Sequence, residues 1–365
     1  MKNHDSLQKD ILAIMVFGIV SILVQASSAN ACGKHFNLPD ESCHEYSVVE
    51  PDDLTRWYFV DEPDNTDWNR GTLSPVVLFF HGALRDAEGM YDLVRWDDPG
   101  GYYDINTDNV ITVYPEGTNW RVPHFLFWND GRNRTWEKTG RGAAKGADDV
   151  GFVIAMLNEL VRIYHIDESR IYAAGASNGG IFVQRLAIEL PTQSRYRLAA
   201  IASVNGLLSD PDHADYTLAG NPPAIPEMIN NVSVPPTPVL IINGTVDMIL
   251  HYNGMPSGEQ SVLLSAEESV SAWVDHNGQG TFEYPTGFDS APYFGDRQIL
   301  LDGCKVYRYW WTDDSQNNQR NVVFYKIKGG NHFWPWEGAI TLWSKCKDFS
   351  TTEDIWKFFS RESLR

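Results

Sequence analysis

One strand–turn–helix segment restricts the folds open to this chain more than any other feature. Gly175-Ala-Ser-Asn-Gly179 is the only Gly-x-Ser-x-Gly sequence in its 365 residues. It follows a run, Arg170–Ala174, that predicts a buried strand, and precedes Ile181–Leu190, which predicts a helix ended by Pro191. Small flanking residues permit a sharp turn that exposes the serine hydroxyl, and the helix N-terminus favours developing negative charge. The segment therefore predicts a nucleophile at a strand–helix turn; the alternative is a glycine-rich turn with a solvated serine.

Strands and helices alternate along the rest of the chain, which predicts a mainly parallel central sheet flanked by helices. Further strands are expected at Pro75–Phe80, Val110–Tyr114, Leu198–Val204, Pro238–Ile242 and Val322–Ile327. Further helices are expected at Val150–Tyr164, at Ser265–His276 behind a capping box, and from Thr351 onward. Two stretches, at about residues 206–236 and 252–321, break the alternation. We expect both to be insertions over the active-site face of a single domain.

Asp148 and Asp149 stand side by side at the start of the helix expected at Val150–Tyr164. Two neighbouring carboxylates resemble an acid–base pair. Carboxylates at a helix start also accept hydrogen bonds from the first N–H groups of the helix. We interpret both residues as helix caps.

A serine hydroxyl is a poor nucleophile unless a base takes its proton and an acid orients that base. Asp247 lies five residues beyond the strand that ends at Ile242, and His332 lies five residues beyond the strand that ends at Ile327. Both loops leave the carboxyl ends of strands, where the Ser177 turn also opens. The order serine, acid, histidine is that of α/β-hydrolases. His251 is the rival base, but it follows Asp247 without an intervening strand.

Attack on an ester produces an oxyanion, which requires preorganised N–H donors. One donor is expected to be the backbone N–H of Asn178, the residue after the nucleophile. The other is expected from the loop His81-Gly82-Ala83-Leu84, which follows an early strand. Ala83 and Leu84 are equal candidates for this second donor.

These motifs resemble secreted esterases grouped with polyhydroxybutyrate depolymerases, feruloyl esterases and acetylxylan esterases. The matching segments run in order from about Val76 to Phe359. They are His81-Gly82, Tyr114-Pro-Glu-Gly117, Ala147-Asp-Asp-Val-Gly-Phe152, Ile166-Asp followed by Arg170-Ile-Tyr172, Gly175-Ala-Ser-Asn-Gly-Gly180, Asn243-Gly-Thr-Val-Asp247 and Gly329-Gly-Asn-His-Phe-Trp-Pro335. The resemblance implies an α/β-hydrolase fold, with Ser177, Asp247 and His332 as the catalytic triad and no metal or organic cofactor.

The expected activity is that of a serine carboxylic-ester hydrolase that forms an acyl-enzyme on an ester substrate. A feruloyl or acetyl ester on plant polysaccharide is the first expectation, and polyhydroxybutyrate, a polyester, is the alternative. A serine peptidase and a non-catalytic binding protein on the same fold are more remote alternatives. Trp128, Trp334 and Trp336 lie near the motifs, and their aromatic faces suit sugar rings, feruloyl rings or a polyester surface.

The N-terminal region has the pattern of a signal peptide. Lys2 and Lys9 precede an apolar run, Ile11–Val24, and Ala29-Asn30-Ala31 matches the small-x-small cleavage pattern. We expect residues 1–31 to be removed, which leaves a catalytic domain of residues 32–365 that is extracellular or periplasmic and carries no membrane segment. An uncleaved anchor and a lipoprotein with Cys32 first are the alternatives.

Four cysteines, Cys32, Cys43, Cys304 and Cys346, follow the expected cleavage site, and an even number in a secreted chain suggests two disulfides. Sequence alone permits three connectivities, of which proximity favours Cys32–Cys43 with Cys304–Cys346. The glycosylation pattern occurs at Asn133, Asn231 and Asn243, and it matters only in a eukaryotic secretory host.

The net charge of −19 bears on possible partners. So acidic a surface repels the phosphate backbone, which disfavours nucleic acid as a partner. It also disfavours polyanionic substrates, so a neutral ester is the simplest match. The alternative reading is that the charge serves only solubility.

Overall fold

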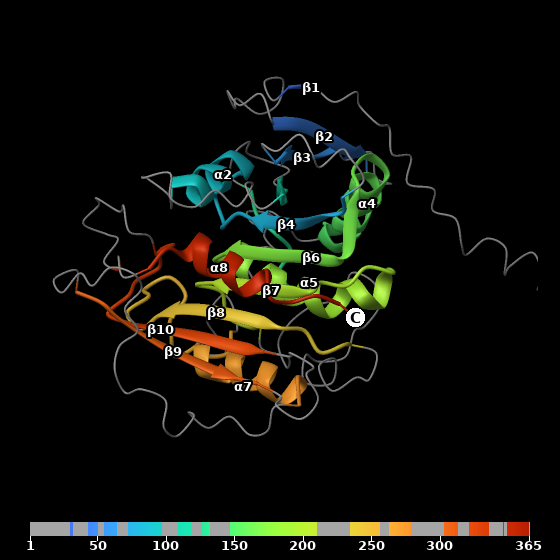
Figure 1. The fold of residues 1–365 in the computed structure, drawn as a ribbon. Helices are drawn as coiled ribbons and strands as arrows, with labels where there is room; N and C mark the ends of the chain where they lie inside the picture. The colour runs from blue at the N-terminus through green and yellow to red at the C-terminus, as the bar shows by residue number, and fades with distance from the viewer. Residues whose placement is uncertain are drawn as a thin grey trace, which may run out of the picture.

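The computed structural model describes residues 30–31, 43–49, 55–63, 72–96, 109–118, 126–131, 147–209, 234–255, 263–278, 303–312, 321–335, 346 and 349–364. Within these ranges, one ten-stranded sheet crosses the molecule in the order β1-β2-β3-β5-β4-β6-β7-β8-β10-β9, and helices lie on both of its faces (Figure 1). This layered arrangement confirms the α/β class expected from the sequence.

The centre of the sheet is parallel and its flanks are antiparallel. The parallel strands are β5 (Ile111–Pro115), β4 (Ser74–Phe80), β6 (Ile166–Ala176), β7 (Ala200–Val204), β8 (Val239–Gly244) and β10 (Val322–Lys328). The antiparallel strands are β1 (Asn30–Ala31), β2 (Cys43–Val49) and β3 (Thr55–Asp61) on one side and β9 (Lys305–Trp311) on the other. The parallel strands present all their carboxyl ends at one edge, which is where the Ser177 turn lies.

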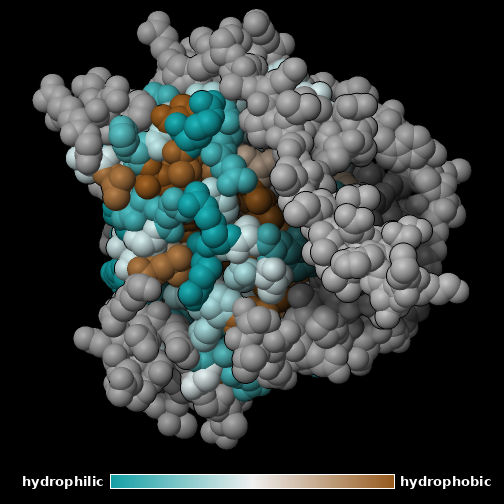
Figure 2. All heavy atoms as spheres, turned by 90° about the vertical axis from the view of Figure 1, so that its right-hand side faces the viewer, coloured by the Kyte–Doolittle hydropathy of each residue, from teal (hydrophilic) through white to brown (hydrophobic). Residues whose placement is uncertain are grey.

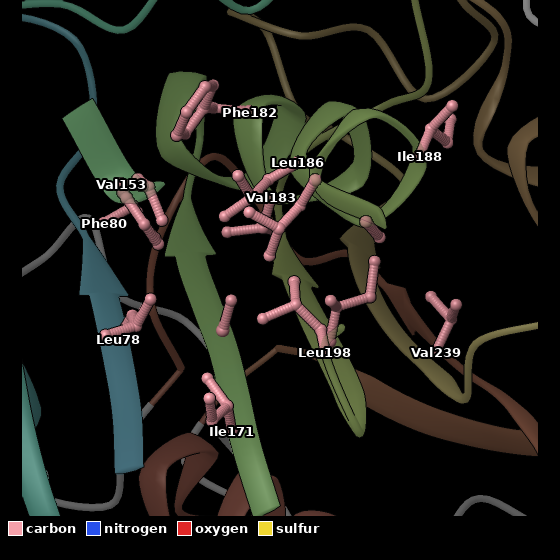
Figure 3. Close-up of a cluster of buried hydrophobic side chains, with 14 of the residues drawn as sticks. Leu78, Phe80, Val153, Ile171, Phe182, Val183, Leu186, Ile188, Leu198 and Val239 are labelled. Carbon is pink, nitrogen blue, oxygen red and sulfur yellow. The ribbon is translucent and has the colours of Figure 1, made fainter. Parts of the chain in front are cut away.

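Each face of the sheet carries its own core. Helices α4 (Asp149–Ile163), α5 (Asn178–Gln193) and α7 (Ala266–His276) pack on one face, and α2 (Ala87–Trp96) and α8 (Thr351–Phe359) on the other. Strand β4 is buried along its whole length because Leu78 and Phe80 point to the first face while Val77 and Phe79 point to the second. Figure 3 shows the first core, where Val183 and Leu186 of α5 point toward the strands. The Phe182 ring packs against that of Phe80, with ring centroids 5.2 Å apart.

Strand β6 begins at Ile166, four residues before the strand start expected at Arg170, and two further differences affect the architecture. Helix α5 continues past Pro191 to Gln193, because Ser194 donates to the Leu190 carbonyl through both its N–H and its hydroxyl and so closes the last turn. Strand β9 lies inside the stretch expected as an insertion, residues 252–321, and pairs antiparallel with β10 as part of the central sheet. That stretch therefore supplies a sheet strand as well as α7, whose capping box between Ser265 and Glu268 is confirmed.

The two neighbouring acids at the start of α4 have different roles. Asp148 is the helix cap, since its side chain accepts a hydrogen bond from the Gly151 N–H at 2.9 Å. Asp149 is buried and forms an ion pair with Arg56 of β3 at 2.7 Å. The expectation that both residues cap the helix is thus correct for Asp148 and wrong for Asp149, whose partner lies far away in the sequence.

Some expectations fall wholly or partly outside the described residues. Most of the predicted signal peptide is not described, and its last two residues, Asn30 and Ala31, pair with β2. None of the helices that the structure describes is long and apolar enough to span a bilayer. The Cys304–Cys346 disulfide is present, whereas the predicted partner of Cys43, Cys32, is not described.

On the face shown in Figure 2, the coloured hydrophobic residues lie in small groups among hydrophilic ones.

Candidate active site

The turn that carries Ser177 joins the carboxyl end of β6 to the start of α5. Ser177 has φ 55° and ψ −117°, a backbone conformation that costs energy for a residue with a side chain, and its N–H donates to the Val204 carbonyl at 2.8 Å. The Ser177 hydroxyl makes no capping bond to α5. The turn thus presents the hydroxyl at the carboxyl edge of the sheet instead of using it to begin the helix.

Ser177, His332 and Asp247 form one hydrogen-bonded chain. His332 Nε2 lies 2.8 Å from Ser177 Oγ, and His332 Nδ1 lies 2.6 Å from Asp247 Oδ2. Because a carboxylate only accepts hydrogen bonds, Nδ1 carries the ring proton and Nε2 is left to accept from the serine hydroxyl. The structure therefore brings together the three residues predicted from the sequence. The rival histidine, His251, is exposed, and it is His332 that contacts Asp247.

The acid in this chain is fixed by backbone hydrogen bonds. Asp247 Oδ1 accepts from the N–H groups of Ile249 and Leu250 at 2.8 and 2.9 Å, and Oδ2 is left for His332. The Asp247 side chain is 1% exposed and that of His332 is 16% exposed. A buried carboxylate with three donors has a single orientation, which fixes the imidazole ring that it contacts.

The loops after β8 and β10 are bonded to each other, which explains why residues distant in sequence meet. The Thr245 N–H donates to the Ile327 carbonyl and the Val246 N–H to the Gly330 carbonyl, both at 2.9 Å. The Asn205 side chain, at the end of β7, donates to the Phe333 carbonyl. Since β8 and β10 are neighbouring parallel strands, their loops start side by side and hold the acid and the base in register.

His81 holds the loop that was expected to supply an oxyanion donor. Its Nε2 accepts the Gly117 N–H at 2.9 Å, so its Nδ1 carries the proton and donates to the Gly82 carbonyl at 2.8 Å. Burial lowers the pKa of His81 to about 4, so the ring is neutral in neutral solution. The Gly82 carbonyl and the Ala83 N–H belong to one planar peptide unit, and His81 therefore orients the Ala83 N–H.

One of the two candidates for the second donor is already occupied. The Leu84 N–H donates to the Leu126 carbonyl at 2.9 Å, which leaves Ala83 as the better candidate. The loop touches the serine, since a Cβ on Gly82 would lie 3.4 Å from Ser177 Cβ. The first candidate, Asn178, opens α5, where the first N–H groups have no acceptor within the helix.

Two of the three tryptophans expected at the substrate lie in the protein core instead. Trp128 is 2% exposed, stacks on Phe182 with ring centroids 5.2 Å apart, and donates from Nε1 to the His81 carbonyl at 3.1 Å. Trp334 is 4% exposed and belongs to the core under α2 and α8. The expected substrate contacts are therefore wrong for both, because their rings are enclosed by protein. Trp336 lies outside the described residues.

Only one of the three asparagines with the glycosylation pattern lies among the described residues. Asn243 is 2% exposed, which leaves no room for a glycan, while Asn133 and Asn231 are outside the described residues. In the part of the chain that the structure describes, no group of three His, Cys, Asp or Glu side chains is placed to hold a metal ion.

Sequence comparison finds esterases among similar proteins. No family model matches the chain. Over 194 residues the chain is 33% identical to NocK of Nocardia uniformis subsp. tsuyamanensis, which is named as an esterase, and this segment covers 51% of the chain and 48% of NocK. Over 179 residues it is 22% identical to the bifunctional acetylxylan esterase/xylanase XynS20E of Neocallimastix patriciarum, covering 49% of the chain and 20% of that protein. The chain spans half or less of the length of these relatives.

Both relatives carry esterase in their names, which confirms the resemblance to esterases that the motifs indicate. Among solved structures, the acetyl xylan esterase from Aspergillus awamori matches with a TM-score of 0.47 and 14% identity, over 87% of this chain and 98% of that chain. So distant a likeness carries no argument about activity. The α/β-hydrolase fold follows from the molecule itself: a mainly parallel sheet, a serine on a strand–helix turn, and an acid and a histidine on later loops of the same edge.

Proposed function

We propose that this chain is a serine carboxylic-ester hydrolase that acts through an acyl-enzyme. The observation that carries the proposal is the hydrogen-bonded chain from Asp247 through His332 to Ser177, with atoms 2.6 and 2.8 Å apart. A serine in such a chain is a nucleophile with its base already in place. The esterase names of the two relatives support the same reaction class.

In the first half of the reaction, Ser177 Oγ attacks the ester carbonyl carbon while His332 Nε2 takes the hydroxyl proton. Asp247 accepts from Nδ1 and stabilises the imidazolium that forms. The carbonyl oxygen becomes an oxyanion, which the N–H groups of Asn178 and Ala83 are to receive. Removal of one such donor typically costs about 10²–10³ in kcat.

Collapse of the tetrahedral intermediate breaks the ester C–O bond, and His332 returns the proton to the departing alcohol. Water then attacks the acyl-enzyme while His332 takes one of its protons. The second tetrahedral intermediate releases the carboxylic acid, and Ser177 regains its proton. One ester and one water become one acid and one alcohol, and the protein is unchanged.

For the substrate, we propose a feruloyl or acetyl ester carried on plant polysaccharide. The name of the relative XynS20E, an acetylxylan esterase and xylanase, supports this class. The net charge of −19 favours a neutral substrate over a polyanionic one. Polyhydroxybutyrate is the competing substrate, and its hydrolysis releases hydroxybutyrate, an acid that neither sugar ester yields.

A substrate panel tests the proposal. The chain without residues 1–31 is incubated with p-nitrophenyl acetate, methyl ferulate, acetylated xylan, polyhydroxybutyrate and a peptide p-nitroanilide, beside a folded His332→Ala variant. We expect hydrolysis of at least one ester by the wild type, a large loss in the variant, and no release of p-nitroaniline. Cleavage of the peptide without any ester identifies a peptidase. Turnover of no substrate by the folded wild type contradicts the proposal.

We also propose that the protein is secreted after removal of residues 1–31. The leader-like pattern of that segment supports this, and so does the Cys304–Cys346 disulfide, because disulfides persist in oxidising compartments. N-terminal sequencing of protein recovered from the culture medium or periplasm is expected to begin at Cys32. An intact N-terminus on cell-associated protein contradicts it.

A further inference from the structure

A short, mostly buried segment, Leu126–Asp130, is hydrogen-bonded to both of the elements that carry the N–H groups proposed to hold the oxyanion. We call it the clamp segment. It comes from neither of the elements that carry those donors, since Ala83 follows β4 and Asn178 begins α5. No motif in the sequence assigns it a role in the reaction. Its contacts nevertheless reach both sides of the proposed oxyanion hole.

On the first side, the clamp segment holds the loop after β4. The Leu126 carbonyl accepts the Leu84 N–H at 2.9 Å, and Trp128 Nε1 donates to the His81 carbonyl at 3.1 Å. These bonds fix the residues on both sides of Gly82 and Ala83. The loop therefore has its position set by the clamp segment as well as by the His81 ring.

On the second side, the clamp segment forms hydrogen bonds with the side chain of Asn178. Asn178 Oδ1 accepts the Trp128 N–H at 2.7 Å, and Asn178 Nδ2 donates to the Trp128 carbonyl at 3.0 Å and to Asp130 Oδ2 at 2.5 Å. Asn178 is 1% exposed and Asp130 is 3% exposed. A carboxylate accepts only, so Asp130 selects the amide orientation that turns Nδ2 toward it. The reversed amide would place two oxygens face to face.

Buried charges anchor the clamp segment to the rest of the protein. The Asn129 N–H donates to Asp149 Oδ2 at 2.5 Å, and the Asn129 carbonyl accepts from Arg185 Nη1 at 2.6 Å. Asp149 pairs with Arg56, and Arg185 with Glu189. Buried ion pairs contribute little net stability because desolvation offsets their attraction. They do fix geometry, because the N–H and the carbonyl of Asn129 are each bonded to one member of a buried pair.

We infer that Asp130 is a positioning residue for the oxyanion hole, acting through the side chain of Asn178 to hold the Asn178 N–H at its place beside Ser177. This inference rests on the proposed function, because an oxyanion hole matters only if Ser177 attacks a carbonyl. A displacement of about 1 Å in a reacting geometry can cost about 10²-fold in rate. Because Asp130 accepts from the side chain of Asn178, we expect its loss to weaken the stabilisation of the transition state.

The test compares Asp130→Ala with Asp130→Asn, whose amide oxygen can still accept from Asn178 Nδ2. The exposed carboxylate Asp275 on α7, changed to Ala, is the matched control. For the ester that the wild type cleaves best, we expect Asp130→Ala to lower kcat about 10- to 100-fold with KM within about twofold. We expect Asp130→Asn and the control to remain within about threefold of wild type.

A second readout separates positioning from a general structural role. Trifluoroacetophenone adds to Ser177 Oγ, its carbonyl oxygen becomes an oxyanion, and the hydroxyl proton passes to His332. Its inhibition constant should rise in Asp130→Ala by about the same factor by which kcat falls. Combining Asp130→Ala with Asn178→Ala should cost no more than Asn178→Ala alone, because the two residues act through one contact.

The outcomes distinguish the inference from the proposed function. A folded Asp130→Ala variant with wild-type kcat overturns the inference and leaves the function intact, as does a lower kcat with an unchanged inhibition constant. If Asp130→Ala fails to fold, Asn178→Ala carries the test, since it keeps the backbone N–H and removes the same contacts. The same loss in kcat is then expected, and wild-type kcat overturns the inference. A wild type that cleaves no ester removes the function and the inference together.

Discussion

Gly175 packs against Gly179 so closely that a Cβ atom on Gly175 would lie 2.3 Å from the Gly179 carbonyl oxygen. Gly179 in turn faces the end of β4, where its own Cβ would lie 2.3 Å from the Phe80 carbonyl oxygen. Both neighbours are backbone atoms, which cannot move aside as a side chain could. The two glycines of the Gly-x-Ser-x-Gly sequence are therefore required by the close approach of α5 to the sheet.

We expect Gly175→Ala to destabilise the protein by about 1–3 kcal/mol, and more if the backbone cannot shift, because the added methyl overpacks the turn. Ester hydrolysis should fall as well, since α5 carries Asn178. Gly89→Ala, in α2, is the control; there a Cβ meets only side chains, those of Asp86 at 3.1 Å and Arg85 at 4.0 Å. Urea unfolding measures both, and equal stabilities for the two variants would contradict the steric account.

His81 should make the stability of the fold depend on pH. Burial lowers its pKa to about 4 in the fold against 6.5 in the unfolded chain. Between these values the unfolded chain binds the extra proton and the folded protein does not. Stability is therefore fully present above about pH 6.5 and falls as pH drops toward 4, by about 3 kcal/mol from this residue. Unfolding free energies from pH 4.5 to 7 should show a shallower slope in His81→Gln; parallel slopes would refute the assignment.

Glu362 should act in the opposite direction. Burial raises its pKa to about 7 from 4.5, so the folded protein holds the proton more tightly than the unfolded chain. The cost of ionising it grows as pH rises from about 4.5 to 7 and is complete above that range. Glu362→Gln keeps an acceptor for Asn321, which donates to Glu362 Oε1 at 2.6 Å. We expect the variant to be more stable at pH 8, on the order of 2 kcal/mol, and equal near pH 4. A constant difference across this range would show that the effect is not ionisation.

The Arg56–Asp149 pair predicts a coupling that a double-mutant cycle can measure. Arg56→Met leaves the buried Asp149 carboxylate without its ion-pair partner Arg56 and should lower the free energy of unfolding by about 3–5 kcal/mol. Asp149→Asn added to Arg56→Met removes that charge while keeping an oxygen for the Asn129 N–H, so the double variant should recover part of the loss. Strictly additive costs in thermal or urea unfolding would show that the two charges are not coupled.

The parts of the fold that the sequence predicts are those decided locally. Strand β4 is recognisable because both of its faces are buried, which makes its sequence a continuous apolar run. The site is predictable because neighbouring parallel strands end at one edge, so loops after β6, β8 and β10 converge there. The serine turn adds steric rules that only glycine meets.

The parts that sequence reasoning missed depend on partners far away in the chain. Asp149 looks like a helix cap because the residues next to it begin a helix, while its actual partner, Arg56, lies 93 residues earlier. The signal was a lone arginine in the apolar strand β3, since a charge there needs a buried counter-charge. The position of Trp128 near a motif does not indicate whether its side chain is exposed. Its burial follows from the stacking of its ring on Phe182. Strand β9 was missed because it lies within a long stretch read as an insertion.

The role of Ser177 as the nucleophile is tested by Ser177→Ala, which removes the attacking hydroxyl. Two measurements are made on the wild type and the variant. One is the hydrolysis of p-nitrophenyl acetate, and the other is the mass of the protein after treatment with a fluorophosphonate. We expect the wild type to hydrolyse the ester and to gain one adduct, on Ser177. The folded variant should gain none and lose about 10⁴- to 10⁶-fold in kcat. A folded Ser177→Ala variant that keeps its activity within tenfold of wild type would show that Ser177 is not the nucleophile.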